Sequence, residues 1–362
     1  MARTIKPTCL LVIIALVIVS LVGCSSEPGK ISEETHPVTS KQNRNDKSVD
    51  VVKRTEKPAI PVRRTEGSTP QTHQPEPLTF SFATKKLSGY KTPAEYLTVA
   101  SKYFPKAIAA VCLPIGYSQN PNIKYPLVIA FGGAGECSRP PKQGALAWID
   151  YYKTDEAVRA LANNHLIPAD LRGLATKHEL QNINNQLLEN PYQGLILVCP
   201  YSPPLKIGNG LENENYEMYL IQELIPALKL NYRVNENQIG VDGVSMGGAR
   251  SMYYGFKYPG VFRSVGSIQA AVGPFMDVYE ELMKKNQDVL KLRSIQLVTS
   301  NKDPMQNSVY KMHKLLKKYD IPHKSFLLTG PHDYIFNQGP GAIALLMFHD
   351  LSLRRTKSGP IK

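Results

Sequence analysis

The stretch Gly243-Val244-Ser245-Met246-Gly247 decides the fold, because it matches G-x-S-x-G, the pattern of a nucleophile elbow. The apolar run Ile239-Gly240-Val241 before it predicts a short buried strand, and residues 249–257 after it predict a helix. A strand, a sharp turn and a helix would present the serine hydroxyl at the top of a sheet, next to free helix N–H groups. We therefore expect Ser245 to be a nucleophile. The alternative is a tight strand-to-helix turn with a solvated serine.

The glycines on either side of Ser245 suit the steric demands of such a turn. A serine held between a strand and a helix adopts a strained backbone conformation. We expect Gly243 and Gly247 to let the strand and the helix pass close to this turn, where a Cβ atom would collide.

The rest of the chain predicts an α/β domain that spans residues 78–353. Strands are expected at residues 79–83, 96–100, 108–113, 127–131, 195–199, 264–268, 295–299 and 325–328. Helices are expected at residues 154–163, 170–189, 213–230, 277–289, 306–318 and 342–351, with a kink or break at Pro226. Strands that alternate with helices imply βαβ crossovers and a mainly parallel twisted sheet flanked by helices.

A serine nucleophile needs a base, and the chain offers four downstream histidines: His313, His323, His332 and His349. His332 alone lies just past the end of a predicted strand, in Gly330-Pro331-His332-Asp333-Tyr334. Catalytic groups collect in loops at the carboxyl ends of parallel strands. We therefore expect His332 to be the base. The alternative is a loop histidine that hydrogen-bonds the following helix.

The acid of a strand–elbow–helix hydrolase comes between the serine and the histidine in the chain. Asp303 follows the predicted strand at residues 295–299 and is the expected acid, in an exposed loop. Its alternative role is a helix cap or turn residue, which Asp-Pro often marks. Asp320 lies at a helix end, and Asp333 is expected to point away from its neighbour His332.

Backbone N–H groups would stabilise the oxyanion of a tetrahedral intermediate, by about 3 kcal/mol for one donor. The first expected donor is the N–H of Met246, directly after the nucleophile. The second should come from Gly132-Gly133-Ala134-Gly135-Glu136, where Gly133 is the first choice and Ala134 the next. A dinucleotide or phosphate loop is the competing interpretation, but neither G-x-G-x-x-G nor a P-loop Lys-Ser/Thr pair is present.

The cysteines predict no disulfide framework, redox site or zinc site. Three of them, Cys112, Cys137 and Cys199, lie in the expected domain, and an odd number argues against full pairing. Cys112 and Cys199 fall in apolar strands and are expected to be small buried hydrophobic residues. The expected chemistry needs no metal and no cofactor.

The formal net charge is +13 at pH 7. Such a balance favours either contact with anionic polymers or, more simply, a solvated basic face. The sequence contains no zinc-finger, RNA-recognition or helix-turn-helix signature, so we expect no nucleic-acid partner.

Residues 1–23 predict a signal peptide, with Arg3 and Lys6 before the apolar residues 9–22. The sequence Leu21-Val22-Gly23-Cys24 resembles the lipobox of bacterial lipoproteins, which implies a lipid on Cys24 and attachment to a membrane. The family sorting pattern, with Ser25 after the cysteine, implies the outer membrane in a cell that has one. An ordinary secretory signal or a short anchor helix is the alternative. The polar composition of residues 24–77 predicts a disordered tether, and residues 354–362 form a basic tail.

Three motifs together resemble the esterase D and feruloyl-esterase branch of α/β hydrolases. They are the elbow with Gly248, the run Tyr258-Pro259-Gly260-Val261-Phe262, and the His332 loop. Poly(3-hydroxybutyrate)-depolymerase-like esterases and predicted secreted peptidases share much of this pattern. The resemblance covers residues 107–351, with Phe131-Gly132 where His-Gly is familiar and Tyr334 where tryptophan is common.

This resemblance implies an α/β-hydrolase fold and hydrolysis of a carboxylic ester through an acyl-enzyme. An acyl group on an extracellular polysaccharide would be a suitable substrate. A secreted peptidase with the same triad and a non-catalytic binding module of the cell envelope are the alternatives. Residues 139–194 exceed what a minimal hydrolase needs and are expected to form a lid or a substrate wall.

Overall fold

The computed structural model describes residues 80–205 and 212–354. These residues belong to one compact unit, Gln74–Lys362. The predicted signal peptide, the lipidated Cys24, the tether up to residue 77 and the tail from residue 355 lie outside the described residues, so these assignments stay predictions.

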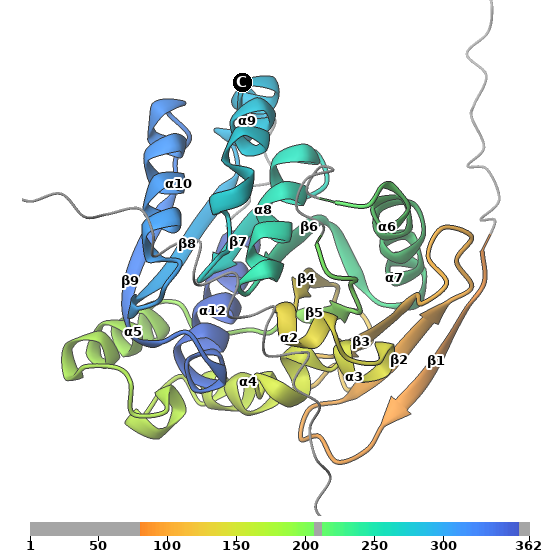
Figure 1. The fold of residues 1–362 in the computed structure, drawn as a ribbon. Coiled ribbons are helices and arrows are strands. Elements are labelled where there is room, and N and C mark those ends of the chain that lie inside the picture. Colours follow the sequence, from red (N-terminus) through yellow and green to blue (C-terminus); the bar gives the residue numbers. More distant parts are fainter. Residues whose placement is uncertain (1–79, 206–211, 355–362) are drawn as a thin grey trace, which may run out of the picture. The chain divides into compact units, whose positions relative to one another are not determined.

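The described strands form one sheet of nine, in the order β1-β2-β3-β5-β4-β6-β7-β8-β9 (Figure 1). They are β1 (Phe82–Leu87), β2 (Ala94–Val99), β3 (Ile108–Cys112), β4 (Tyr125–Phe131), β5 (Ile196–Pro200), β6 (Val234–Gly243), β7 (Ser264–Ile268), β8 (Ser294–Lys302) and β9 (Lys324–Pro331). Strands β4 to β9 pair in parallel, whereas β1, β2 and β3 are antiparallel and join the rest through β5. The first three strands are antiparallel because no helix separates them in the chain.

The helices include several short turns that the sequence did not predict. The α-helices are α2 (Ala134–Cys137), α3 (Pro141–Gly144), α4 (Thr154–Ala162), α5 (Lys177–Glu189), α6 (Glu214–Met218), α7 (Ile225–Asn231), α8 (Met246–Lys257), α9 (Met276–Leu290), α10 (Gln306–Lys318), α11 (Tyr334–Phe336) and α12 (Ala342–Arg354). The π-helical and 3₁₀ turns are η2 (Ala147–Tyr151), η3 (Pro168–Leu171), η4 (Tyr219–Leu224), η5 (Gly273–Phe275) and η6 (Asn337–Gly341). The helix predicted over 213–230 runs as α6, η4 and α7 with helical backbone angles at both junctions, and Pro226 lies at the start of α7, after the π-helical η4.

The two faces of the sheet carry separate cores. In β4 the side chains of Leu127 and Ile129 join one core with α6 to α10, whereas Val128 and Ala130 join the other with α4, α5 and α12. Figure 1 shows these two groups of helices on opposite faces of the strands. Every residue of β4 is buried, which explains its unbroken apolar run.

The carboxyl ends of the parallel strands bring the predicted site residues to one edge of the sheet. Gly133 follows β4, Ser245 follows β6, Asp303 directly follows β8 and His332 directly follows β9. This is the edge at which open α/β sheets bind ligands. The described helices include none that is both long enough and apolar enough to cross a membrane.

Candidate active site

Ser245 lies at a sharp turn between β6 and α8, as the elbow pattern predicts. Its backbone has φ 56° and ψ −116°, a strained conformation for a residue with a side chain. A Cβ atom at position 243 would come within 2.3 Å of the Gly247 carbonyl oxygen. One at position 247 would come within 2.5 Å of the Gly132 oxygen. Glycine is therefore required on both sides of the half-buried serine, and the predicted packing is confirmed.

Asp303 and His332 form the contact that their strand positions predict. The His332 Nδ1 atom lies 2.7 Å from the Asp303 Oδ1 atom. Asp303 also accepts hydrogen bonds from the Thr299 hydroxyl at 2.6 Å and the Met305 N–H at 2.8 Å. The expectation of an exposed loop carboxylate is wrong, because this side chain is fully buried while His332 is 22% exposed.

The other candidates for base and acid have different partners. Asp333 caps α11 by accepting the Phe336 N–H at 3.1 Å, so it does face away from His332. His313 and His323 bond to each other at 2.7 Å. Within the described residues, only His332 among the downstream histidines contacts Asp303.

Gln269 connects the elbow to the His332 loop, a link that the sequence did not reveal. The Ser245 N–H donates to the Ile268 carbonyl at 2.9 Å. The next residue, Gln269, uses its side-chain amide to donate to the Pro331 carbonyl at 2.9 Å. No hydrogen bond joins Ser245 to His332 in the part of the chain that the structure describes. We call Ser245, His332 and Asp303 the elbow set.

The N–H groups of the two loops beside Ser245 differ in whether they have an acceptor. The Gly133 N–H donates to the Tyr152 hydroxyl at 3.1 Å and is occupied. The N–H groups of Ala134 and Met246 open α2 and α8, and neither finds an acceptor among the described residues. The arrangement therefore favours Ala134, the second choice from the sequence, over Gly133 as a partner donor to Met246.

A buried carboxylate, Glu136, lies beside this loop and was not predicted to matter. The Tyr334 hydroxyl donates to it at 2.6 Å, and the Tyr152 hydroxyl donates to its other oxygen. Burial raises the pKa of Tyr152 well above its usual value, so this phenol stays protonated. A Cβ atom at Gly133 would lie 3.4 Å from Glu136 and 3.8 Å from the Ser245 Cβ, so the cluster adjoins the nucleophile.

The first part of residues 139–194 packs against the end of β4 and the loop that follows it. Trp148 in η2 is fully buried and donates its indole N–H to the Phe131 carbonyl at 3.0 Å. Arg139 stacks on Tyr151 at 4.3 Å, and a hydrogen bond to Tyr334 raises its pKa. These contacts connect the start of the segment to β4 and to Tyr334, and the expected lid or substrate wall stays a prediction. The spacing of the segment's aromatic residues gave no signal, because they contact a loop distant in sequence.

A second set of the same residue types lies entirely within the core. The Ser264 hydroxyl lies 2.6 Å from His349 Nδ1, and His349 Nε2 lies 3.0 Å from Asp242. Asp242 also accepts the Gly243 N–H at 2.7 Å, directly before the elbow. All three side chains are fully buried, and Gly266 leaves the space for the Asp242 carboxylate. We call these three residues the buried set.

The cysteines are free and buried: Cys112, Cys137 and Cys199. Burial raises the pKa of the Cys112 thiol to about 11 and that of Cys199 to about 12, so both behave as small apolar side chains. Within the described ranges, no group of three or more His, Cys, Asp or Glu side chains is arranged to hold a metal ion.

Comparison with known proteins shows the family of this chain. The family model described as putative esterase matches residues 105–294, more than half of the chain. The chain belongs to this esterase family. It is a carboxylic ester hydrolase, and the sequence-based resemblance to the esterase branch is confirmed.

Solved esterase and hydrolase structures are similar to this chain. A ferulic acid esterase matches with a TM-score of 0.52 and 14% identity over 76% of this esterase and 100% of that chain. An S-formylglutathione hydrolase from Agrobacterium tumefaciens matches with a TM-score of 0.49 and 14% identity, covering 74% and 98% of the two chains. A ferulic acid esterase from Anaeromyces mucronatus matches with a TM-score of 0.45 and 18% identity, covering 77% and 94%. The match with a TM-score of 0.52, together with the mainly parallel sheet, confirms the predicted α/β-hydrolase fold.

Proposed function

We propose that this esterase cleaves carboxylic esters through an acyl-enzyme, with the elbow set as its catalytic triad. The single observation that carries the proposal is the 2.7 Å contact between His332 Nδ1 and the buried carboxylate of Asp303. With its Nδ1 proton held by Asp303, His332 keeps the lone pair of Nε2 free to act as a base.

In the proposed reaction, the Ser245 hydroxyl attacks the ester carbonyl while His332 accepts its proton. The C–O bond of the ester then breaks, and the alcohol leaves with the proton that His332 returns. Water, deprotonated by His332, attacks the acyl-enzyme and releases the carboxylic acid and the serine. Asp303 stabilises the imidazolium that forms in both halves of the reaction and remains ionised throughout.

The oxyanion of each tetrahedral intermediate would accept hydrogen bonds from the Met246 and Ala134 N–H groups. Both groups open a helix, where the dipole also favours negative charge. Glu136 is held by two phenol donors, Tyr152 and Tyr334, which offset the repulsion that a nearby carboxylate would exert on the oxyanion.

A substrate panel with a burst measurement tests this proposal. It would comprise acetyl, feruloyl and short-chain aryl esters together with a peptide. We expect ester turnover with an initial burst of alcohol equal to one per Ser245 when deacylation is slow. Turnover of the peptide but not of any ester would contradict the ester-hydrolase proposal and support the peptidase. An acyl group on an extracellular polysaccharide is the proposed natural substrate, and it rests on the resemblance of the sequence motifs to the feruloyl-esterase branch.

The proposed location is the bacterial cell envelope, with the esterase outside the cytoplasm on a lipid anchor at Cys24. The lipobox-like sequence Leu21-Val22-Gly23-Cys24 motivates it. The Cys24→Ser variant should leave the membrane fraction after a carbonate wash, because the lipid has no attachment site. Retention of this variant in the washed membranes would show that Cys24 is not the anchor.

A further inference from the structure

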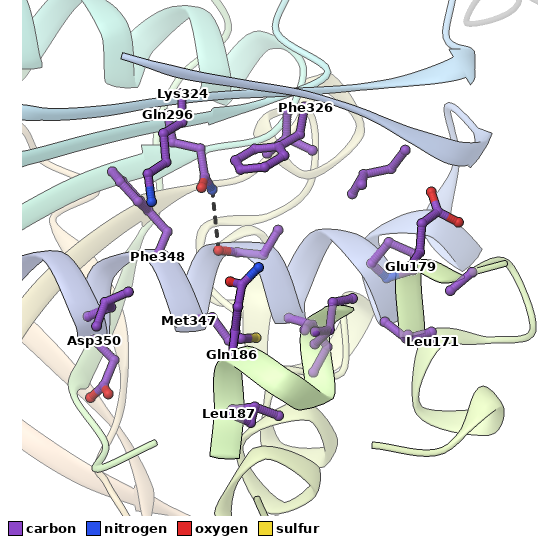
Figure 2. A pocket seen from close by; sticks show the side chains of 18 of the residues that line it. Leu171, Glu179, Gln186, Leu187, Gln296, Lys324, Phe326, Met347, Phe348 and Asp350 are labelled. Carbon is purple, nitrogen blue, oxygen red and sulfur yellow. Dashed lines mark hydrogen bonds between the residues drawn. The ribbon is translucent and has the colours of Figure 1, made fainter. Parts of the chain in front are cut away.

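A hollow of about 140 Å³ lies between α5, α12, the edge strand β9 and its neighbour β8 (Figure 2). None of the elbow set lines it. Its walls are mainly apolar and include Ile183, Leu187, Phe326, Leu328 and Ile343. An engineered apolar cavity of about 150 Å³ in another protein binds benzene, so this hollow matches the size of one aromatic ring.

The hollow exists because the elements around it leave the sheet edge uncovered. Strand β9 is the last strand of the sheet, and its Phe326 side chain stays 39% exposed. Helix α12 presents the small Ala344 toward this space. No larger side chain fills the gap, so an apolar body could bury Phe326 and gain hydrophobic free energy.

The two ends of the hollow differ in charge. Lys324 and Gln296 are paired residues of β9 and β8, and Figure 2 shows both at the end near Phe348. No acidic side chain pairs with Lys324 among the described residues. Asp350 is already satisfied by Arg354 at 2.9 Å.

The opposite end of the hollow carries Glu179, which is fixed as a helix cap by the Thr176 N–H at 2.6 Å. A ligand with one negative charge would therefore be attracted to the Lys324 end and repelled from the Glu179 end.

We propose that this hollow is a binding site for a small aromatic carboxylate, with the ring between α5 and α12 and the carboxylate at Lys324. The volume of the hollow fits one aromatic ring, and the unpaired Lys324 at one end of the hollow favours a carboxylate. The proposal is independent of the catalytic role of the elbow set.

Calorimetric titration of the full-length protein tests the site with two probes of equal shape, 3-phenylpropanoate and its neutral amide. We expect the carboxylate to bind roughly fivefold more tightly than the amide, which is what a partly exposed ion pair contributes. Lys324→Met should remove this preference while the amide affinity stays unchanged. Lys314→Met, at an exposed lysine on α10 that does not line the hollow, is the matched control and should bind like the wild type.

Variants that fill the hollow with a larger side chain provide a second test. Ala344→Phe, or Ile183→Phe if the first variant does not fold, should abolish binding of both probes while thermal unfolding stays cooperative. Absence of binding to the wild type would overturn the proposal. Unchanged binding in the Lys324 variant and in the folded filling variant would also overturn it, because the probe would then occupy another site such as the elbow.

Discussion

The elbow set and the buried set contain the same three residue types and differ in backbone and access to solvent. In the elbow set, Ser245 has a strained backbone directly before α8 and lies next to N–H groups without acceptors. The buried set joins β6, β7 and α12 inside the core, and its histidine has no exposed surface. The comparison teaches that a Ser–His–Asp contact alone does not make a site for nucleophilic chemistry. A site also needs an exposed hydroxyl and donors that meet the developing charge.

Replacement of the serine in each set should give the largest difference in activity between the two sets. Ser245→Ala should lower kcat on an aryl acetate by about 10⁶, as loss of a serine nucleophile does in a well-studied protease. Ser264→Ala should keep most of the kcat, because its hydroxyl bonds only within the core. Steady-state kinetics on both purified variants checks this. A similar loss of kcat in the two variants would contradict the assignment of Ser245 alone as the nucleophile.

The aspartate of the elbow set is the next test. Asp303→Asn should lower kcat by about 10⁴, because the amide favours the wrong tautomer of His332. Since Asp303 is buried and accepts three hydrogen bonds, thermal unfolding must be measured alongside activity. Asp333→Asn, at the cap of α11, and Asp320→Asn are the controls and should keep their activity. Loss of activity in a control but not in Asp303→Asn would refute the assignment of the acid.

The histidines should separate the two sets by stability. His349→Ala leaves the buried Asp242 without its partner, and burial already raises the pKa of that carboxyl. Breaking a buried pair in this way costs about 3–5 kcal/mol of the free energy of unfolding. His332→Ala removes a partly exposed side chain and should cost far less stability while abolishing activity. Urea unfolding of both variants measures the difference, and equal stabilities would contradict a structural role for the buried set.

The smallest expected effect concerns the donors that only the elbow set has. Ala134→Pro removes one N–H at the first position of α2, where proline is tolerated. The preceding Gly133 has φ −75° and ψ −175°, which a following proline accepts. We expect kcat to fall by about 10²–10³ with little change in KM. An unchanged kcat would exclude the Ala134 N–H and return Gly133 to consideration.

Local patterns predicted the parallel part of the fold well. The bounds of α10 match because its buried residues Val309, Met312 and Leu316 recur on one helix face. The positions of Asp303 and His332 followed from strand order, since each lies shortly after a predicted strand and directly after the observed β8 or β9. The antiparallel arrangement of β1 to β3 was less visible, because β1 is largely exposed and lacks a clear apolar pattern.

Contacts between distant segments could not be predicted. Tyr152 and Gln269 adjoin the elbow only because their segments fold onto it, and their local sequence carries no motif. Glu136 lies in the loop predicted to supply the second donor, but its contacts with Tyr152 and Tyr334 come from distant segments. The burial of Asp303 was missed for the same reason: the Thr299 and Met305 groups that satisfy it depend on how β8 ends. The buried set escaped notice because Asp242, Ser264 and His349 lie in three separate elements.

Labelling with a fluorophosphonate probe, followed by peptide mapping, tests the central claim most directly. Such probes react with a serine that is both activated and accessible, so the two sets should respond differently. We predict one label per protein on Ser245, none on Ser264, and loss of labelling in His332→Ala. Absence of any label on the folded protein, or labelling of a serine other than Ser245, would contradict the claim that the elbow set is the catalytic triad of this esterase.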